Sequence, residues 1–180
     1  MKYFDIVNEE DLVIGFASSS EFQSNPNLIH RVAHFAVVDG IQQKILVGQR
    51  SPSADFDSGL WGFMAEPLFK GDRFPTAVYR GMKDKINLES NEGIGEWCRT
   101  IFHQDQQTEF ARFFVVYYQE GRVVPNPAEI SQLKWVAADE LRSQSLPYSK
   151  MTQYWIEHAN WDEIMRYVKV FIESGIKSDQ

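Results

Sequence analysis

Cysteine is nearly absent from this sequence: Cys98 is the only one, so no disulfide can form within the chain. Long apolar runs are missing too, since none approaches the roughly 18 continuous residues of a membrane helix. The first ten residues lack a basic segment followed by an apolar stretch, the pattern of a secretory signal. We therefore expect a cytoplasmic protein that has no membrane span and is stabilised by its hydrophobic core.

Positive charge is scarce as well. Lysine and arginine contribute 18 residues against 25 acidic ones, which leaves a net charge of −7 at pH 7. A field of that sign repels polyanions, so we expect no binding to nucleic acid or to anionic membranes. The apolar fraction is 43%, typical of a globular protein, and 180 residues correspond to about one domain. The chain is predicted to form a single domain over residues 1–180.

Apolar segments separated by turn residues predict most of a sheet. The polar segment 18–27 contains Pro26 and is expected to be a connecting loop. The expected strands form three pairs and two single segments: 3–7 with 12–17, 32–38 with 44–49, 94–103 with 109–118, then 60–64 and 133–136.

A helix is expected to open at Pro75, because Val78, Met82 and Ile86 recur every four residues on one helical face. Three more helices are expected near the C-terminus, with Gly175 as a stop signal. They span 138–143, 149–159 and 161–173. Strands and helices in this order predict an α/β (α+β) sandwich, with an N-terminal hairpin over 2–18 and C-terminal helices over 138–175.

The segment 61–88 resembles the signature of the Nudix superfamily. That signature runs Gly, five residues, Glu, seven residues, Arg-Glu, an aliphatic, any residue, Glu-Glu, any residue, Gly and an aliphatic. The corresponding positions here hold Glu66, Asp72, Arg80-Gly81, Met82, Lys83, Asp84-Lys85, Ile86, Asn87 and Leu88. The preceding Trp61-Gly62-Phe63-Met64 is similar to the family's Trp-any-Phe-Pro strand. The resemblance implies a Nudix-type, MutT-like α/β/α sandwich with a mixed central sheet and a degenerate Nudix box.

Other segments agree in order and spacing, among them Gln49-Arg50 and the pair Glu140-Leu141 after the last strand. The N-terminal hairpin, with residues 28–31, is similar to the branch of the family that includes isopentenyl-diphosphate isomerase. The isomerase needs a cysteine and a histidine between positions 61 and 72, and this chain has neither there. We therefore expect no isomerase activity and interpret His30 as structural.

The resemblance implies a cofactor only if the chain is active. Active members hydrolyse a nucleoside diphosphate linked to another group, with Mg²⁺ or Mn²⁺ held by the box glutamates. On a helix those positions share a face, and here they hold Gly81, Asp84 and Lys85. Exchanging Glu for Lys changes the charge by two units, which at about 5 Å from a divalent ion costs on the order of 3 kcal/mol even in water. We therefore predict that the usual metal site does not form.

Several residues stay open between two roles. Asp72, Asp84, the Ala65 carbonyl and Glu109 are candidate metal ligands, and Asp84 is the catalytic candidate if the chain is active. Alternatively, Asp84 pairs with Arg80 one turn earlier and Asp72 caps or pairs near the helix start. In the family the box arginine orients a box carboxylate, so an Arg80 to Asp72 contact would be structural.

The candidate substrate contacts are Arg50, Arg31 and Phe63. Arginine forms bidentate hydrogen bonds to phosphate, but either arginine can equally join an ion pair. A cavity beside Phe63 and Arg50 would favour ligand binding, whereas a filled site would favour protein interaction. Cys98 is interpreted as a buried, inert thiol.

Three functions therefore remain open. The first is a Nudix-fold protein that keeps a nucleotide-like pocket and hydrolyses poorly or not at all, with a small phosphorylated or nucleotide ligand as partner. The second is an active hydrolase with recruited carboxylates, for which the candidates are Glu66, Glu89, Glu92 and Glu109. The third is a protein-interaction module, in which exposed aromatic residues of the C-terminal helices would indicate a partner surface or a homodimer.

Overall fold

The computed structural model describes residues 2–89, 93–104 and 107–175. The strands are β1 (Tyr3–Val7), β2 (Val13–Ser18), β3 (Ile29–Asp39), β4 (Lys44–Arg50), β5 (Trp61–Gly62), β6 (Met64–Pro67), β7 (Ile94–Gln104), β8 (Gln107–Tyr118) and β9 (Ile130–Ala137). The helices are α1 (Ser19–Ser24), α2 (Phe74–Ile86), α3 (Ala138–Arg142), α4 (Lys150–His158) and α5 (Trp161–Ser174). None of the described helices is long and apolar enough to span a membrane.

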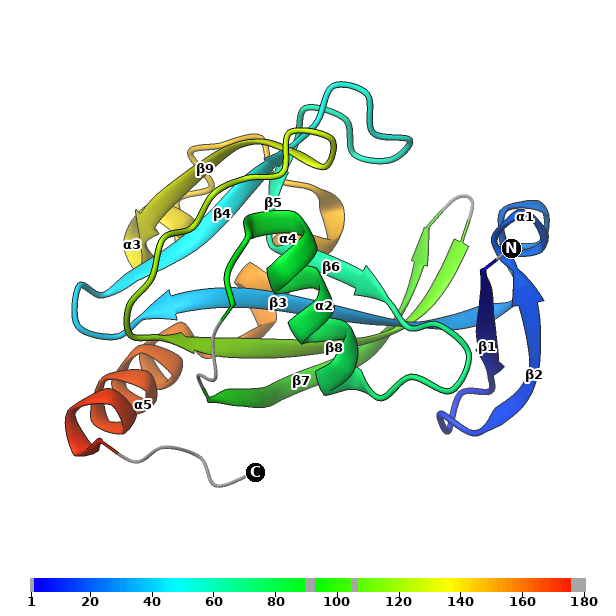
Figure 1. Ribbon diagram of the computed structural model, residues 1–180, viewed down its shortest axis with the longest axis horizontal. Coiled ribbons are helices and arrows are strands. Elements are labelled where there is room, and N and C mark those ends of the chain that lie inside the picture. Colours follow the sequence, from blue (N-terminus) through cyan, green and yellow to red (C-terminus); the bar gives the residue numbers. More distant parts are fainter. Residues whose placement is uncertain (1, 90–92, 105–106, 176–180) are drawn as a thin grey trace.

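The strands form one mixed sheet, with α2 on one face and α4 and α5 on the other (Figure 1). At its centre β3 runs parallel to β8, and β3 also pairs antiparallel with β1, β4 and β6. The hairpin β1–β2 lies at one end of the sheet, shown in blue, next to α1. The predicted α/β (α+β) sandwich with a mixed central sheet is confirmed.

Alternation along β3 divides the core into two layers. Ala33, Phe35 and Val37 pack with α2, whereas Ala36 and Val38 pack with α4 and α5. All five side chains are fully buried. Strand β3 therefore places Phe35 beneath α2, the helix of the Nudix-like segment, and the neighbouring His34 on the opposite face of the sheet.

The expected hairpins and C-terminal helices are present, and Gly175 ends α5 in the left-handed conformation with φ 64°. The connection between the expected strands 94–103 and 109–118 includes residues 105 and 106, which lie outside the described residues. Two expectations are wrong. The expected strand 60–64 is divided into β5, which pairs with β4, and β6, which pairs with β3. The segment 18–27 is not all loop, because α1 lies within it. Ser18 and Glu21 form a capping box there, and the buried Phe22 anchors the helix. The polar composition that favoured a loop therefore comes partly from the capping groups of a short helix.

Helix α2 buries the face that the periodicity predicted. Val78, Met82 and Ile86 are fully buried, and the same face carries Gly81 and Lys85. Lysine is rarely buried unless it is paired, so the position of Lys85 requires a partner in the protein interior.

The C-terminus of α2 is held by the loop that leads into β9. Asn126 donates its backbone N–H to the Lys85 carbonyl at 2.8 Å and its Nδ2 to the Asp84 carbonyl at 2.9 Å. The Val124 N–H donates to the Ile86 carbonyl. These bonds satisfy the last carbonyls of the helix and fix the loop beside Lys85.

Candidate functional site

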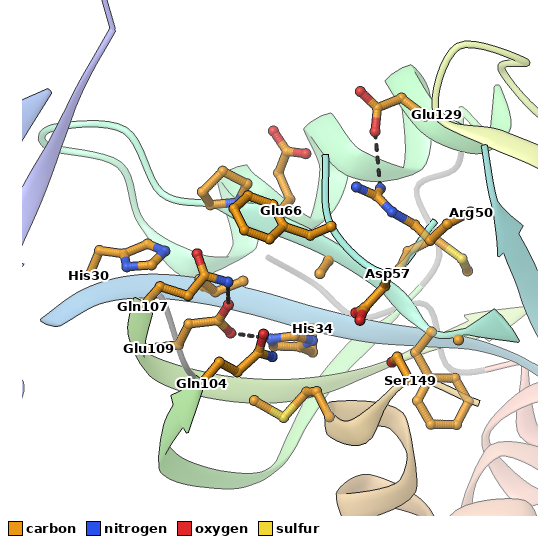
Figure 2. A pocket seen from close by; sticks show the side chains of 18 of the residues that line it. His30, His34, Arg50, Asp57, Glu66, Gln104, Gln107, Glu109, Glu129 and Ser149 are labelled. Carbon is orange, nitrogen blue, oxygen red and sulfur yellow. Dashed lines mark hydrogen bonds and ion pairs between the residues drawn. The ribbon is translucent and has the colours of Figure 1, made fainter. Parts of the chain in front are cut away.

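A cavity of about 440 Å³ opens beside the box helix, and Phe63 and Arg50 both line it. Figure 2 shows two polar groups in it: Arg50 with Glu129 on one side, and His34 with Glu109 on the other. A volume of this size is typical of small-molecule sites, which usually lie in the range of about 300–1,000 Å³. The cavity expected for a ligand-binding protein is therefore present.

The partners of Lys85 are two carboxylates of the cavity wall. Its Nζ lies 3.2 Å from Glu66 Oε2 and 3.3 Å from Glu129 Oε2. The side chains of Lys85 and Glu66 are each only 10% exposed, so this is a largely buried ion pair. Glu129 also accepts a hydrogen bond from Arg50 Nη1 at 3.1 Å. Burial alone would raise the pKa of Glu129, but Lys85 and Arg50 outweigh it and hold that pKa below its ordinary value.

Arg80 holds the other side of Glu66. Its Nε donates to Glu66 Oε1 at 2.8 Å, its Nη1 to Asp72 Oδ2 at 2.6 Å, and its Nη2 to the Pro67 carbonyl at 2.7 Å. Burial would lower the pKa of Arg80, but the bonds to Glu66 and Asp72 raise it further than burial lowers it. The Arg80 to Asp72 contact is the one expected of a structural box arginine.

The alternative pairing of Arg80 with Asp84 is wrong. Within the described residues no ion pair joins them, because the Arg80 side chain extends toward β6 while Asp84 is exposed on α2. The two box aspartates therefore have different surroundings: Asp72 is bound to Arg80, and Asp84 faces solvent.

The packing of α2 against β3 and β6 leaves room only for a glycine at position 81. A Cβ atom at Gly81 would lie 2.8 Å from Phe35 Cε1 and 3.2 Å from Glu66 Cβ. The three departures from the family signature, at Glu66, Gly81 and Lys85, therefore depend on one another. Gly81 leaves room for the Glu66 side chain, and Lys85 compensates the charge of Glu66.

Replacing Gly81 by alanine is expected to lower the free energy of unfolding by about 1 kcal/mol. Alanine favours a helix by up to about 1 kcal/mol over glycine, but overpacking a filled core costs typically about 1–3 kcal/mol. Urea unfolding of Gly81→Ala measures the balance. In a Phe35→Leu background the alanine penalty should disappear, and an alanine variant more stable than the wild type would contradict the close contact.

A divalent metal ion does not fit these residues. Mg²⁺ and Mn²⁺ require several oxygen ligands with carboxylate charge. The described part of the chain contains no group of three or more histidine, cysteine, aspartate or glutamate side chains placed to hold a metal. Glu66 lies between two cations, and an ion bound to it would lie close to the Lys85 ammonium group. Ala65, whose carbonyl was a candidate ligand, is half-buried on β6 and lines the cavity.

The candidates for recruited carboxylates do not gather around Asp84. Glu89 is exposed and pairs with Lys83, and Glu92 lies outside the described residues. Glu109 is buried, and its oxygens accept hydrogen bonds from other cavity residues instead. A carboxylate cluster like that of an active box is therefore not formed by the described residues.

Glu109 and His34 form the second polar group of the cavity, which the sequence did not predict. Glu109 Oε2 lies 2.9 Å from His34 Nε2, and Gln107 Nε2 donates to Glu109 Oε1 at 2.9 Å. Burial would raise the pKa of Glu109, but the hydrogen bond from His34 and the charges of His34 and His30 hold it below its ordinary value. His30 bonds the Thr108 carbonyl through Nδ1, and burial lowers its pKa. One sequence feature could have indicated this polar group: His30 and His34 are four residues apart, so in a strand they face the same side.

Asp57 extends into the cavity between these two groups (Figure 2). Its backbone is in the left-handed region with φ 54°, which is uncommon for a residue other than glycine. Burial raises the pKa of Asp57, Arg50 opposes that shift, and the charge of Glu109 adds to it. No sequence pattern pointed to this residue.

The other residues singled out in the sequence, Arg31, Phe63 and Cys98, make contacts within the protein. Arg31 pairs with Asp11 at 2.6 Å and with Asp5 at 3.8 Å, and it is not among the residues that line the cavity. Arg31 therefore has the partners of the ion-pair alternative, and its role as a phosphate contact stays a prediction. Phe63 packs on the core, with its ring centroid 5.3 Å from those of Phe113 and Trp161. Burial raises the pKa of Cys98 to about 11, which favours the unreactive thiol.

Comparison with known families identifies the fold. Residues 29–158 match the family model described as NUDIX domain. The chain belongs to the Nudix family. Among curated proteins, no sequence matches it significantly.

Several solved structures resemble this one at low sequence identity. DR0079 from Deinococcus radiodurans has a TM-score of 0.73 at 18% identity, covering 88% of this chain and 99% of its own. A MutT NUDIX hydrolase from Burkholderia pseudomallei has a TM-score of 0.60 at 19% identity, covering 72% and 96%. The NUDIX domain of Shewanella oneidensis NrtR, in complex with ADP ribose, has a TM-score of 0.57 at 18% identity, covering 78% and 96%. At these identities the likeness concerns the fold.

Proposed function

We propose that this Nudix protein binds a small phosphorylated or nucleotide-like ligand and has weak or no metal-dependent hydrolysis. The observation that carries the proposal is the Lys85 ammonium group, nine-tenths buried and ion-paired with Glu66 inside the box. A fixed cation in that place supplies positive charge without a metal. It also repels a divalent ion, so the charge that would activate water is lost, while the ammonium group itself can still bond to an anionic oxygen.

The cavity supports ligand binding over a purely structural role. It is lined by Arg50 and Lys85, cations of the kind that bind phosphate, and by the aromatic ring of Phe63. The NUDIX domain of NrtR binds ADP ribose in its crystal structure, on the same fold. A nucleoside diphosphate with a linked group is therefore the ligand class that we propose.

The interaction-module alternative has support from a different surface. Large apolar side chains are exposed on and before β2, the first strand in the sheet order: Leu12, Val13, Ile14 and Phe16. They are not among the cavity-lining residues. A partner or second copy at this surface would thus be an addition to ligand binding and not a replacement for it.

A hydrolysis screen tests the proposed loss of activity. Nucleoside diphosphate sugars, dinucleotides, coenzyme A and NADH would be incubated with Mg²⁺ or Mn²⁺, using wild type and Asp84→Ala. We expect at most weak turnover, equal in both proteins, because Asp84 faces solvent and no carboxylate of residues 2–89, 93–104 and 107–175 joins it in a metal-binding group. Calorimetry with the same compounds in EDTA is expected to detect binding of at least one. Rapid metal-dependent turnover that disappears in Asp84→Ala would refute the proposal.

A further inference from the structure

Two cations of the cavity converge on one oxygen atom. Arg50, at the end of β4, and Lys85, in the last turn of α2, lie 3.1 and 3.3 Å from Glu129 Oε2. An oxygen shared by an arginine and a lysine from separate elements is the arrangement in which proteins commonly bind a phosphate oxygen. Here the carboxylate of the protein itself takes that position.

Glu129 is more exposed than Glu66, the other carboxylate that pairs with Lys85. Its side chain is 42% exposed, whereas that of Glu66 is 10% exposed. Arg80 and Lys85 fix Glu66 from both sides, but the contacts of Glu129 are to Arg50 and Lys85 at the cavity. An ion pair exposed to this degree contributes little to stability, so its exchange for another anion costs little.

The backbone around Glu129 does not have to move for that exchange. The Glu129 carbonyl accepts a hydrogen bond from the Ser51 N–H at 3.0 Å, and the Glu129 N–H donates to the Asn126 carbonyl at 2.9 Å. Rotation of the side chain alone would release Arg50. Lys85 would keep Glu66 as its partner, so no buried charge would be left unpaired.

We propose that the Glu129 carboxylate is an internal competitor for the ligand, and that a phosphate group displaces it from Arg50 and Lys85. The inference rests on the proposed function of the cavity and assigns the place of the anionic group within it. A terminal phosphate offers several oxygens and more negative charge than a carboxylate, so it can bridge both cations. A neutral nucleoside cannot displace Glu129, which makes the site selective for phosphorylated ligands without a metal ion.

Calorimetric titration of Glu129→Gln tests the competition. ADP, inorganic pyrophosphate and adenosine would be titrated into wild type and variant in EDTA at low salt. Glutamine keeps the shape of the side chain but removes the negative charge beside the bound phosphate. We expect ADP and pyrophosphate to bind about fivefold to tenfold more tightly to the variant. Adenosine affinity should not change.

Glu140→Gln is the matched control. Glu140 lies on α3, pairs with Lys134 and is not among the cavity-lining residues, and its replacement changes the net charge by the same single unit. It should leave ADP affinity unchanged. In the Glu129→Gln background, Arg50→Gln should weaken ADP binding, because the ligand then loses one of its two cations.

The outcomes separate this inference from the proposed function. Equal ADP affinity in Glu129→Gln and wild type, or equal tightening in Glu140→Gln, would overturn the competition while leaving ligand binding by the cavity intact. If neither wild type nor Glu129→Gln binds ADP, pyrophosphate or any compound of the hydrolysis screen, both proposals are overturned. Thermal unfolding of each variant shows that the fold is retained before binding is compared.

Discussion

Replacing Lys85 by glutamate is expected to lower the free energy of unfolding by about 3 to 5 kcal/mol in the absence of metal. The substitution removes the ammonium group between Glu66 and Glu129 and adds a third carboxylate beside them. Glu66 keeps Arg80 and Glu129 keeps Arg50, but Arg80 is shared with Asp72, so two guanidinium groups do not compensate these carboxylates together with a new one at position 85. Urea unfolding in EDTA measures the loss.

The same variant should gain stability from manganese. Three carboxylates on one wall offer hard oxygen ligands. If the dissociation constant for Mn²⁺ is about tenfold below a millimolar Mn²⁺ concentration, binding should restore about 1 to 2 kcal/mol of the free energy of unfolding. Lys85→Met is the control, because it removes the cation without adding a ligand, and it should lose stability in EDTA and gain none from Mn²⁺. Wild type stabilised by Mn²⁺ as strongly as Lys85→Glu would mean that the lysine does not exclude the metal.

The sequence predicted the position of Lys85 but not its partners. Helical spacing indicated that positions 81 and 85 share a face, and both are buried on α2. The spacing also placed Asp84 with them, but it lies on the exposed side, because the buried face is centred on Val78 and Met82. The sequence did contain one indication of the partner of Lys85. Glu66, an acid, occupies the glycine position of the signature, and Lys85, a base, occupies one of its glutamate positions.

Glu129 could not be predicted, because its position depends on contacts far along the chain. It precedes β9 in a loop outside the signature segment 61–88, and Asn126 holds that loop at the end of α2. Likewise, the parallel pairing of β3 with β8 joins residues about 80 positions apart. Local patterns predicted the strands themselves, since apolar runs and turns are short-range features, but partners across the sheet are decided by packing.

Replacing Arg80 by leucine is expected to lower the free energy of unfolding by about 3 to 5 kcal/mol. The guanidinium donates from its three nitrogens to Glu66, to Asp72 and to the Pro67 carbonyl. Leucine leaves these acceptors without that donor, and a buried acceptor without a partner costs about 1–3 kcal/mol. Arg80 also stacks on the ring of Phe69, at 4.1 Å from its centroid. Urea unfolding at neutral pH measures the effect.

Arg73→Leu and Arg80→Lys make the interpretation specific. Arg73 is the exposed residue that precedes α2, so its replacement removes the same charge at the same helix and should change stability by less than about 0.5 kcal/mol. Lysine at position 80 keeps the charge but cannot direct donors at three acceptors, so a loss of about 1–3 kcal/mol should remain. If Arg80→Lys were as stable as wild type, charge alone would account for the role of Arg80. A loss in Arg80→Lys instead means that the directed bonds hold Glu66 in position to receive Lys85.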